Sequence, residues 1–390
     1  MGERKTYRLG DIVDLFDHKR IPLSSSQRLK RKGIYPYYGA QGIIDYIDDY
    51  IFDGEYLLIA EDGENLKSKK QNIAQIAKGK YWVNNHAHIL KNNGLCNLRY
   101  LCYILNRIDI SGYITGSAQP KLNQANLLSI TLSLPSIEEQ DKIATFISNL
   151  DDKIELNRRI NANLEEQAQA LFKSWFVDFE PFRDGPFVDS ELGKIPQGWK
   201  VTELGNVTKQ KTEKVGQQTT VKVLSPVTAG ELVLSEEYFT KQVFSESIAK
   251  YIIVKPNQFA YNPARINIGS IGRNTFGFDG CVSPVYVVFE CEKGYHYFFD
   301  FFRKTDAFKK AVISRAIGGV RQTLGYKDFA LIKVVYPPEN VVRKFNAIYI
   351  NLLNSQNHHN LENKTLSALR DTLLPKLMSS ELSVKNDYEL

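Results

Sequence analysis

The strongest constraint on the fold is an internal repeat of about 200 residues. The stretch GSAQPKLNQANLLSITLSLPS, residues 116–136, aligns without a gap with GGVRQTLGYKDFALIKVVYPP, residues 318–338, at an offset of 202. The alignment keeps Gly, Leu, Ile and Pro identical at 116/318, 122/324, 130/332 and 135/337. Solenoid repeats have periods of about 20–50 residues. A period this long therefore indicates a duplicated domain.

Each copy of the repeat has two parts, a head and a helical segment. The heads share their first residues, because RLGDIV at 8–13 resembles ELGNVT at 203–208. Short apolar runs in the heads, such as YLLIAEDGEN and SPVYVVFECEKG, alternate with Gly, Pro and Asn, which is typical of short strands and turns. NLRYLCYILNRI indicates some helix. We therefore expect an α+β fold: two α/β domains, each followed by a long helix.

The helical segments show a strict heptad pattern, which keeps one seam of a helix facing a partner helix. The first helix is bounded by Pro135 and Pro181, and the second is expected over about Glu339 to Met378. About 40 residues at 1.5 Å each give a helix of roughly 60 Å. The residues predicted to pair are Ile143, Ile147, Leu150, Ile154, Asn157, Asn161, Leu164 and Leu171 in the first helix, and Phe345, Leu352, His359, Asn363, Leu366 and Leu373 in the second.

Both seams are apolar at their ends and polar in the middle, where Asn157 and Asn161 align with His359 and Asn363. An antiparallel pair would bring the two polar middles together. A buried polar layer weakens a coiled coil but fixes its register and orientation. The alternative is a middle that is wet and loosely packed.

These patterns divide the chain into six segments. The segment 181–198 is rich in Pro and Gly, and we expect a connection without a core of its own. The expected segments are the first head (1–134), the first helical segment (135–180), the linker (181–198), the second head (199–336), the second helical segment (337–380) and a tail (381–390).

Charge is distributed unevenly along the chain. Residues 1–133 carry 18 basic and 13 acidic side chains, and residues 199–335 carry 19 and 12, whereas 134–180 carry 5 and 10. Basic heads suit a polyanion, of which nucleic acid is the commonest in a cytoplasm. Ordinary variation in surface charge is the alternative.

Several function classes lack their motifs. There is no P-loop and no G-x-G-x-x-G, and none of the catalytic patterns that we compared holds. The four cysteines form no C-x-x-C. His86 and His88 would share one strand face, but no carboxylate or cysteine cluster accompanies them in the sequence. A hydrogen-bonded structural histidine is therefore favoured over a metal ligand, and we expect no metal. No apolar run approaches 18 residues and the first residues are charged, so we expect a cytoplasmic protein without a membrane segment.

The segment LPSIEEQDKIATFISNLDDKIELNRRINANLEEQAQALFKSWFVDFEPF, residues 134–182, resembles the central conserved region of the specificity (S) subunits of type I restriction–modification enzymes. LGKIPQGWKVTELGNV, residues 192–207, resembles the start of that family's second recognition domain, and LRDTLLPKLMSSE resembles its C-terminal ending, with SSE where SGE is typical. The resemblance spans the whole chain.

The resemblance implies a DNA-binding subunit of a restriction system used in host defence. Each recognition domain would read one half of a bipartite, asymmetric target in double-stranded DNA, and the paired helices would set the half-site spacing. Two methyltransferase (M) subunits would dock on the helices, and two motor–nuclease (R) subunits would join them. The chain would have no catalysis of its own, because S-adenosylmethionine, ATP and Mg²⁺ belong to the partner subunits of the endonuclease/adenine-N6 methyltransferase complex.

In the first head, phosphate contacts are expected from a dense basic and polar cluster and from a second lysine patch. The first cluster is Lys19, Arg20, Ser24, Ser25, Arg28, Lys30, Arg31 and Lys32, with Tyr37 and Tyr38, and the second is Lys67, Lys69 and Lys70. For any one lysine the alternative is a solvated surface charge. Base edges are expected to be read from the Gly-rich loop that offers Ser117, Gln119 and Lys121.

In the second head, the repeated loop offers Gly319, Arg321 and Gln322. The other candidates are Lys209, Lys211, Lys214, Asn262, Arg265, Asn267 and Arg273. For YNPARIN the alternative is a turn with a structural asparagine.

Two other functions remain open from the sequence. One is a stand-alone restriction–methylation enzyme, against which the missing motifs argue. The other is a structural coiled-coil scaffold whose basic heads bind another polyanion. Steep salt dependence of DNA binding would separate a DNA reader from such a scaffold.

Overall fold

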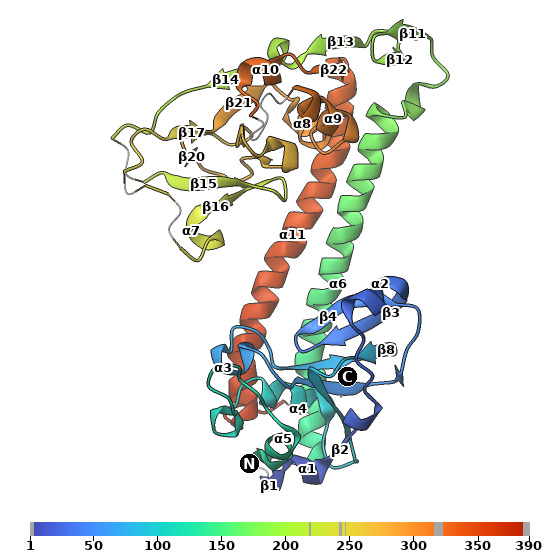
Figure 1. Cartoon of the computed structure of the whole chain (residues 1–390), viewed down its shortest axis with the longest axis vertical. Coiled ribbons are helices and arrows are strands. Elements are labelled where there is room, and N and C mark those ends of the chain that lie inside the picture. The colour runs from blue at the N-terminus through green and yellow to red at the C-terminus, as the bar shows by residue number, and fades with distance from the viewer. Residues whose placement is uncertain (1–3, 218–219, 242–243, 246, 316–322, 385–390) are drawn as a thin grey trace, which may run out of the picture. The chain divides into compact units, whose positions relative to one another are not determined.

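The structure, a computed structural model, describes residues 4–217, 220–241, 244–245, 247–315 and 323–384 (Figure 1). The chain divides into two compact units: unit 1 is Met1–Arg158 with Asn360–Leu390, and unit 2 is Arg159–His359. Two helices of 40 residues each, α6 (Ile137–Phe176) and α11 (Glu339–Met378), contribute one part to each unit. The predicted helix length of about 40 residues is confirmed.

Head 1, from β1 to β10, lies in unit 1 and contains one two-stranded and two four-stranded sheets, ordered β1-β10, β2-β9-β6-β7 and β4-β3-β8-β5. All pairs are antiparallel except β3 with β8. The strands are β1 Lys5–Arg8, β2 Val13–Leu15, β3 Lys32–Gly39, β4 Gly42–Ile47, β5 Phe52–Asp53, β6 Tyr56–Ala60, β7 Ala74–Ala77, β8 Lys80–Val83, β9 Ala87–Asn92 and β10 Thr131–Leu134. The short helices are α1 Leu9–Ile12, η1 Asp17–Lys19, α2 Ser25–Lys30, α3 Asn65–Ser68, α4 Leu98–Leu105, η2 Ser111–Tyr113 and α5 Gln124–Ser129.

Head 2, from β13 to β22, lies in unit 2 and repeats this order strand for strand, as β13-β22, β14-β21-β18-β19 and β16-β15-β20-β17. The single parallel pair, β15 with β20, also recurs in the same place. The strands are β13 Lys200–Glu203, β14 Thr208–Lys211, β15 Lys222–Val227, β16 Glu231–Leu234, β17 Ile252–Val254, β18 Phe259–Tyr261, β19 Ile271–Arg273, β20 Gly280–Val282, β21 Val287–Cys291 and β22 Lys333–Tyr336. The short helices are η4 Leu204–Asn206, α7 Ser235–Tyr238, η5 Ile266–Ile268, α8 His296–Phe302, α9 Asp306–Arg315 and α10 Tyr326–Ala330. The predicted duplication and the α+β class are confirmed.

Each head begins and ends in one two-stranded ribbon. In head 1, Lys5 pairs with Leu134 and Arg8 with Thr131. In head 2, Lys200 pairs with Tyr336 in the matching ribbon. The chain therefore enters and leaves each head at neighbouring points.

The ends of the long helices are part of the cores of the heads. Ile143 and Ile147 of α6 and Leu374 of α11 are buried in the same apolar cluster as head 1 residues such as Leu9 and Leu101. In unit 2, an aromatic cluster joins Phe172 and Phe176 of α6 and Phe345 of α11 to head 2. Three residues of the predicted seam, Ile143, Ile147 and Phe345, are thus buried in the cores of the heads. Among the other seam positions, Ile154 is buried, whereas Leu150, Leu164, Leu352, Leu366 and Leu373 are partly exposed, and Leu171, Leu352 and Leu373 pack against the edges of these clusters.

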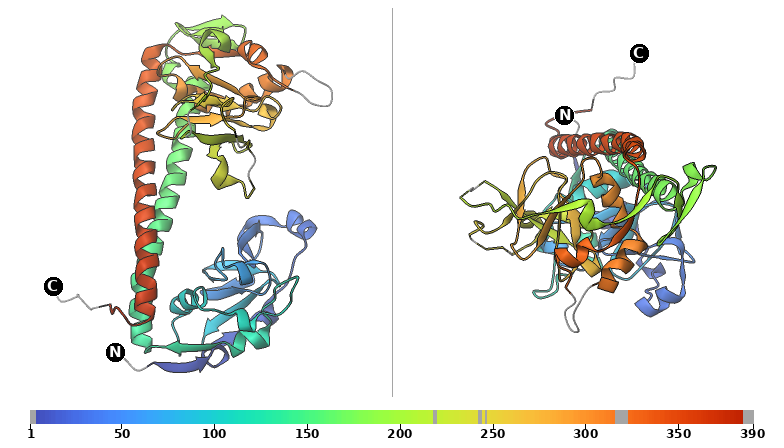
Figure 2. Two further views of the ribbon diagram at one scale, coloured as in Figure 1. Left: turned by 90° about the vertical axis from the view of Figure 1, so that its left-hand side faces the viewer. Right: turned by 90° about the horizontal axis from the view of Figure 1, so that it is seen from above.

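The polar positions of the two helices meet, as an antiparallel pair requires. In unit 1, the Asn157 amide donates to Asn363 Oδ1 at 2.9 Å and to Glu362 at 2.7 Å. In unit 2, Asn161 Oδ1 lies 2.9 Å from His359 Nδ1, and the Gln356 amide donates to the Asn161 carbonyl at 3.0 Å. Figure 2 shows the α6 and α11 segments of each unit side by side. The antiparallel pairing is confirmed, and the polar side chains are hydrogen-bonded across it.

The predicted linker contains regular structure and packs on unit 2. The segment after α6 contains η3 (Glu180–Phe182) and the antiparallel hairpin of β11 (Phe187–Ser190) and β12 (Gly193–Pro196). Ile195 is only 3% exposed and belongs to the core cluster of unit 2, with Trp199 just beyond the segment. The Pro and Gly content of the segment predicted its turns, but it carried no information about the packing of these apolar side chains. Among the described residues, no helix combines the length and apolar character that crossing a membrane would need.

Candidate nucleic-acid interface

The loop Thr115–Leu122 of head 1 is a closed turn with an exposed tip. Thr115 and Lys121 exchange two backbone hydrogen bonds, each of 2.8 Å. Gly116 has a φ of +81°, and a Cβ built there would lie 2.2 Å from the Gln119 carbonyl, so this turn requires glycine. Ser117 and Gln119 are exposed at the tip. The predicted base-reading residues are therefore presented to solvent by a tightly built turn.

Backbone contacts fix the end of this loop on the sheet. The Leu122 N–H donates to the Glu61 carbonyl at 2.8 Å, and the Gly63 N–H donates to the Pro120 carbonyl at 3.2 Å. Lys67, predicted to contact phosphate, donates from Nζ to the carbonyls of Gly116 and Ser117 at 3.1 Å. The structure thus gives Lys67 a second role as a support of the loop.

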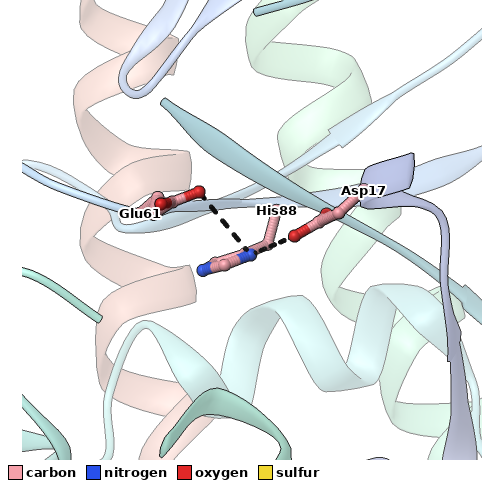
Figure 3. Close-up of side chains that lie close together, drawn as sticks. All are labelled: Asp17, Glu61 and His88. Atoms are coloured by element: carbon pink, nitrogen blue, oxygen red, sulfur yellow. Dashed lines mark hydrogen bonds and ion pairs between the residues drawn. The ribbon is translucent and has the colours of Figure 1, made fainter. Parts of the chain in front are cut away.

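A buried ionic cluster lies beneath the loop and consists of Asp17, Glu61 and His88, which lie close together in Figure 3. His88 on β9 is 1% exposed. Its Nδ1 lies 2.5 Å from Asp17 Oδ2 and 4.0 Å from Glu61, and its Nε2 lies 2.8 Å from the Leu122 carbonyl. The interpretation of His88 as a hydrogen-bonded structural histidine is confirmed, but the expectation that no carboxylates accompany it is wrong.

Two cations of the chain complete this cluster. Arg20 lies 3.2 Å from Asp17 and 2.7 Å from Glu61, and Lys121 Nζ lies 3.2 Å from Glu61. Burial of the Glu61 carboxyl raises its pKa, but Arg20, His88 and Lys121 outweigh burial and hold that pKa below its usual range. Among the described residues, Asp17, Glu61 and His88 are the group whose ligand atoms lie close enough to hold a metal ion. Because Arg20 and Lys121 already neutralise the carboxylates, the geometry favours an internal ion-pair network over a metal centre.

Most of the basic cluster at 19–32 is paired with acidic or aromatic side chains. Arg28 and Lys32 both contact Asp45, and Arg31 contacts Asp48 and Asp49. The Lys32 ammonium and the Tyr46 N–H hold the pKa of Asp45 below its usual range. The guanidinium groups of Arg28 and Arg31 also lie over the rings of Tyr37 and Trp82, and Lys19 lies over Phe16. These pairs reduce the positive potential that the count of basic residues alone suggested.

The polar members of this cluster have structural roles as well. Ser24 caps α2, since its Oγ accepts from the Gln27 N–H while Gln27 reaches back to the Ser24 N–H. Tyr37 is 1% exposed and forms part of a small core with Ile47. Burial raises the pKa of Tyr38, which is also partly covered. Lys19, Ser25, Lys30, Lys69 and Lys70 are exposed, although Ser25 accepts from Arg28 and Lys69 lies 3.4 Å from Asp109.

In head 2, the predicted residues are scattered. Lys209 and Lys214 are exposed, whereas Lys211 pairs with Glu290 and helps to hold the pKa of that carboxyl below its usual range, against the effect of burial. Asn262 Oδ1 accepts from the Ala264 N–H at 3.0 Å, which is the structural-asparagine turn that the sequence left open. Arg265 is exposed and Asn267 is partly exposed in the same turn.

Arg273 is placed inside head 2 and not on its surface. It is 7% exposed, and its guanidinium lies 2.8 Å from both Asp300 and Asn257 Oδ1. Arg303 makes a second ion pair with Asp300 at 2.6 Å. A contact of Arg273 with DNA would have to break this buried network. Gly319, Arg321 and Gln322 lie outside the described residues; Leu324, which follows them, donates to the Pro263 carbonyl at 3.0 Å.

The sequence analysis missed Asp17 and Glu61 and recognised His88 only as structural. The internal repeat gave an indirect signal, because it aligns Leu122 with Leu324 at the end of the repeated loop. Residues that hold Leu122 in place are therefore candidates for supporting that loop. The contribution of all these side chains to DNA binding stays a prediction.

Comparisons with known proteins point to one family. A family model described as the type I restriction modification DNA specificity domain matches residues 1–166. The type I restriction enzyme MjaIX specificity subunit of Methanocaldococcus jannaschii is 28% identical over 318 residues, covering 76% of this chain and 72% of the relative. The HindI specificity subunit of Haemophilus influenzae is 26% identical over 331 residues, covering 67% and 71%.

A solved structure is similar in fold over nearly the whole chain. The crystal structure of the type I restriction–modification S subunit from M. genitalium superposes with a TM-score of 0.61 at 15% sequence identity, covering 96% of each chain. The sequence matches to named specificity subunits, the specificity-domain model and the shared fold agree with one another. In sequence, the chain is similar to type I restriction–modification specificity subunits, and in fold it is similar to a solved S subunit.

Proposed function

We propose that head 1 and head 2 each read one half of a bipartite, asymmetric target in double-stranded DNA. The observation that supports this proposal is the strand order of the heads, which recurs among the described residues, with the Leu122 and Leu324 N–H groups bound at matching positions. In head 1 the tip of that loop exposes Ser117 and Gln119, and an amide side chain such as that of Gln119 can hydrogen-bond adenine at two positions in the major groove. Two readers with different loops suit a target whose halves differ in sequence.

The helix pair is proposed to set the gap between the half-sites and to dock methyltransferase subunits. Hydrogen-bonded polar layers at Asn157/Asn363 and Asn161/His359 support a fixed register, because a slip by one heptad would leave buried polar groups without partners. A fixed register gives a fixed helix overlap, which a ruler requires.

As a specificity subunit, the chain is a non-catalytic part of a larger complex. We propose two methyltransferase and two motor–nuclease subunits as its partners, with S-adenosylmethionine, ATP and Mg²⁺ bound by them. A cytoplasmic location follows from this proposal, since the complex acts on the DNA of a host cell and on DNA that enters it.

Methylation mapping tests the proposed function. The chain is expressed with its methyltransferase partner, and the modified adenines in host DNA are mapped. The expected result is one bipartite sequence with a constant gap. Methylation without sequence preference would contradict the proposal.

The scaffold alternative predicts a different dependence on salt. A reader that contacts several phosphates loses DNA affinity steeply as salt rises, with a slope near −0.9 per phosphate contact. Binding to the mapped target is measured over a salt series, with a scrambled target as the control. Equal affinity for both targets at every salt concentration would favour a scaffold for polyanions.

A further inference from the structure

The His88 ring lies between two hydrogen-bond acceptors. The Leu122 carbonyl can only accept, so Nε2 must donate to it across 2.8 Å. On the other side, Asp17 Oδ1 accepts from the Ile89 N–H at 2.9 Å and Asp17 Oδ2 lies 3.2 Å from the Arg20 guanidinium, so both carboxylate oxygens face donors. Nδ1 must then donate to Asp17 across 2.5 Å. Both ring nitrogens therefore carry a proton, and His88 is a buried imidazolium.

This imidazolium is placed where it can control the position of the reading loop. Leu122 closes the loop whose tip exposes Ser117 and Gln119. Its N–H is held by the Glu61 carbonyl and its own carbonyl by His88, so both backbone groups of one residue are fixed. The cluster joins η1, β9 and the end of β6 to the loop through Asp17, His88 and Glu61.

Among the described residues of head 2, the positions that match His88 and Glu61 carry no charged side chain. The pairs Leu57↔Leu90 and Ile59↔His88 of β6 and β9 correspond to Phe259↔Phe289 and Tyr261↔Val287 of β18 and β21. Val287 therefore occupies the position of His88. Pro263 occupies that of Glu61, since its carbonyl accepts from Leu324 as Glu61 accepts from Leu122. Neither residue has a side chain that can carry a charge.

We propose that His88 is a positioning residue for DNA reading by head 1 alone: its ring, protonated at both nitrogens, holds the Leu122 carbonyl and thereby sets the tip of the loop. The proposal rests on the proposed function of head 1 as the reader of one half-site. A neutral ring has one N–H and would release either Asp17 or Leu122. Discrimination by head 1 should therefore decline as pH rises, while that of head 2 stays constant.

Every charged group that faces the ring is part of the proposal. Asp17 and Arg20 come from η1 and the residue after it, Glu61 follows β6, and Lys121 comes from the loop. Close by along the chain, His86 is exposed and lies 2.7 Å from Asp62. His86 is thus a neighbouring histidine without a contact to the loop carbonyl, and it provides a matched control.

The test uses the full chain with its methyltransferase partner and DNA libraries in which one half-site at a time carries a mismatch. Discrimination is the ratio of methylation rates on correct and mismatched targets, so the pH dependence of the methyltransferase cancels. It is measured over about pH 6 to 9, where an imidazole changes charge. The half-site of head 1 is identified by exchanging residues 1–133 for the head of a relative.

The expected result is a loss of discrimination that is confined to the half-site of head 1. His88→Leu should lower its discrimination by about tenfold, the usual effect of losing hydrogen bonds to charged groups. His88→Gln keeps one donor and should give a smaller loss that no longer varies with pH. His86→Gln should behave like the natural chain. If His88→Leu does not fold, Asp17→Asn keeps an acceptor for the Ile89 N–H and should lower discrimination at the same half-site.

Three results would overturn the proposal: unchanged discrimination in a folded His88→Leu or Asp17→Asn variant, equal losses at both half-sites, or a pH dependence that disappears in His86→Gln and persists in His88→Gln. Failure of the proposed function looks different. In that case the natural complex itself methylates no bipartite sequence.

Discussion

Head 1 and head 2 share one strand order, but Leu122 and Leu324, which occupy matching positions, are held by different physical means. In head 1, the residue that closes the loop, Leu122, rests on a buried ionic cluster. In head 2, the matching Leu324 rests on the Pro263 carbonyl, and the neighbouring Tyr261 and Phe329 rings pack at 5.4 Å in an aromatic core. The comparison teaches that the strand order depends on the apolar pattern of the strands, while the support of the loop is free to diverge.

Head 2 does contain a buried ionic network, but in a different part of the fold. Arg273 at the end of β19 and Arg303 after α8 both contact Asp300. Burial raises the pKa of Asp300, but the two guanidinium groups outweigh burial and hold it below its usual range. This network connects a strand to a helix, whereas the network of head 1 connects three elements to a loop. Substitutions in these two ionic networks should therefore have unequal effects on the reading of DNA.

The largest effect should come from exchanging a whole head. Replacing residues 1–133 by the head of a relative should change one half-site completely and leave the other half-site and the gap unchanged, because head 1 is closed by its own ribbon. Methylation mapping gives the result, and the converse exchange of residues 199–335 is the control. A change in both half-sites would show that the two heads read as one surface.

The next effect tests what the two heads share, the helix pair. Four residues inserted after Arg159 in α6 and four after Asn360 in α11 lengthen both helices by about 6 Å. The polar layers stay matched, since the insertions lie between Asn157/Asn363 and Asn161/His359. We expect a gap longer by about two base pairs of 3.4 Å and unchanged half-sites. An insertion in α6 alone is the control and should destabilise the pair. An unchanged gap in the folded double insertion would exclude the helices as the ruler.

A smaller effect should separate base reading from phosphate contact in head 1. Gln119→Ala should weaken binding to the target by about 1–3 kcal/mol and relax only the half-site of head 1, because Gln119 is exposed at the loop tip. Lys30→Ala should weaken all sequences alike and flatten the salt slope by about one unit. Binding is measured on matched, mismatched and scrambled DNA. Uniform weakening by Gln119→Ala would place the base contacts elsewhere.

The smallest effect is a difference in acid stability between the heads. Burial of the His296 ring and the nearby Arg273 lower the pKa of His296 to about 4. Unfolded histidine titrates near 6.5, so the unfolded chain binds more protons as pH falls from about 6.5 to about 4, and the stability of unit 2 decreases in that window. In head 1, the pKa of the Glu61 carboxyl is lowered from that of an ordinary glutamate. Protonation of Glu61 should therefore reduce the stability of head 1 only in the lower part of this pH window.

Tryptophan fluorescence can measure the acid sensitivity of unit 2. A Trp82→Phe variant keeps only Trp175 and Trp199, which both pack with the core of unit 2. Urea midpoints of this variant should fall between pH 6.5 and 4, and His296→Gln should reduce the fall. A fall of the same size in both variants would assign the acid sensitivity to other groups.

The sequence predicted the architecture well because periodic and repeated patterns determine it. The heptad seam gave both helices with their lengths, and the repeat gave two heads of one topology. The support of the reading loop could not be predicted in the same way. Asp17, Glu61 and His88 come from three separate elements, and only the sheet register brings them together. Composition also overstated the surface charge, because Arg20 and Arg273 form ion pairs with carboxylates inside the heads that lie far from them in the sequence.

The ribbon that opens and closes each head has a consequence for how such genes can change. Because Lys5 lies opposite Leu134, and Lys200 opposite Tyr336, both ends of a head lie in one short ribbon. Two genetic crossovers, one before the first strand of the ribbon and one after its second strand, would transfer a complete head as a cassette. The recipient chain would keep its own spacer and acquire a new half-site in one event. In this architecture, an exchanged head brings both strands of its own ribbon with it.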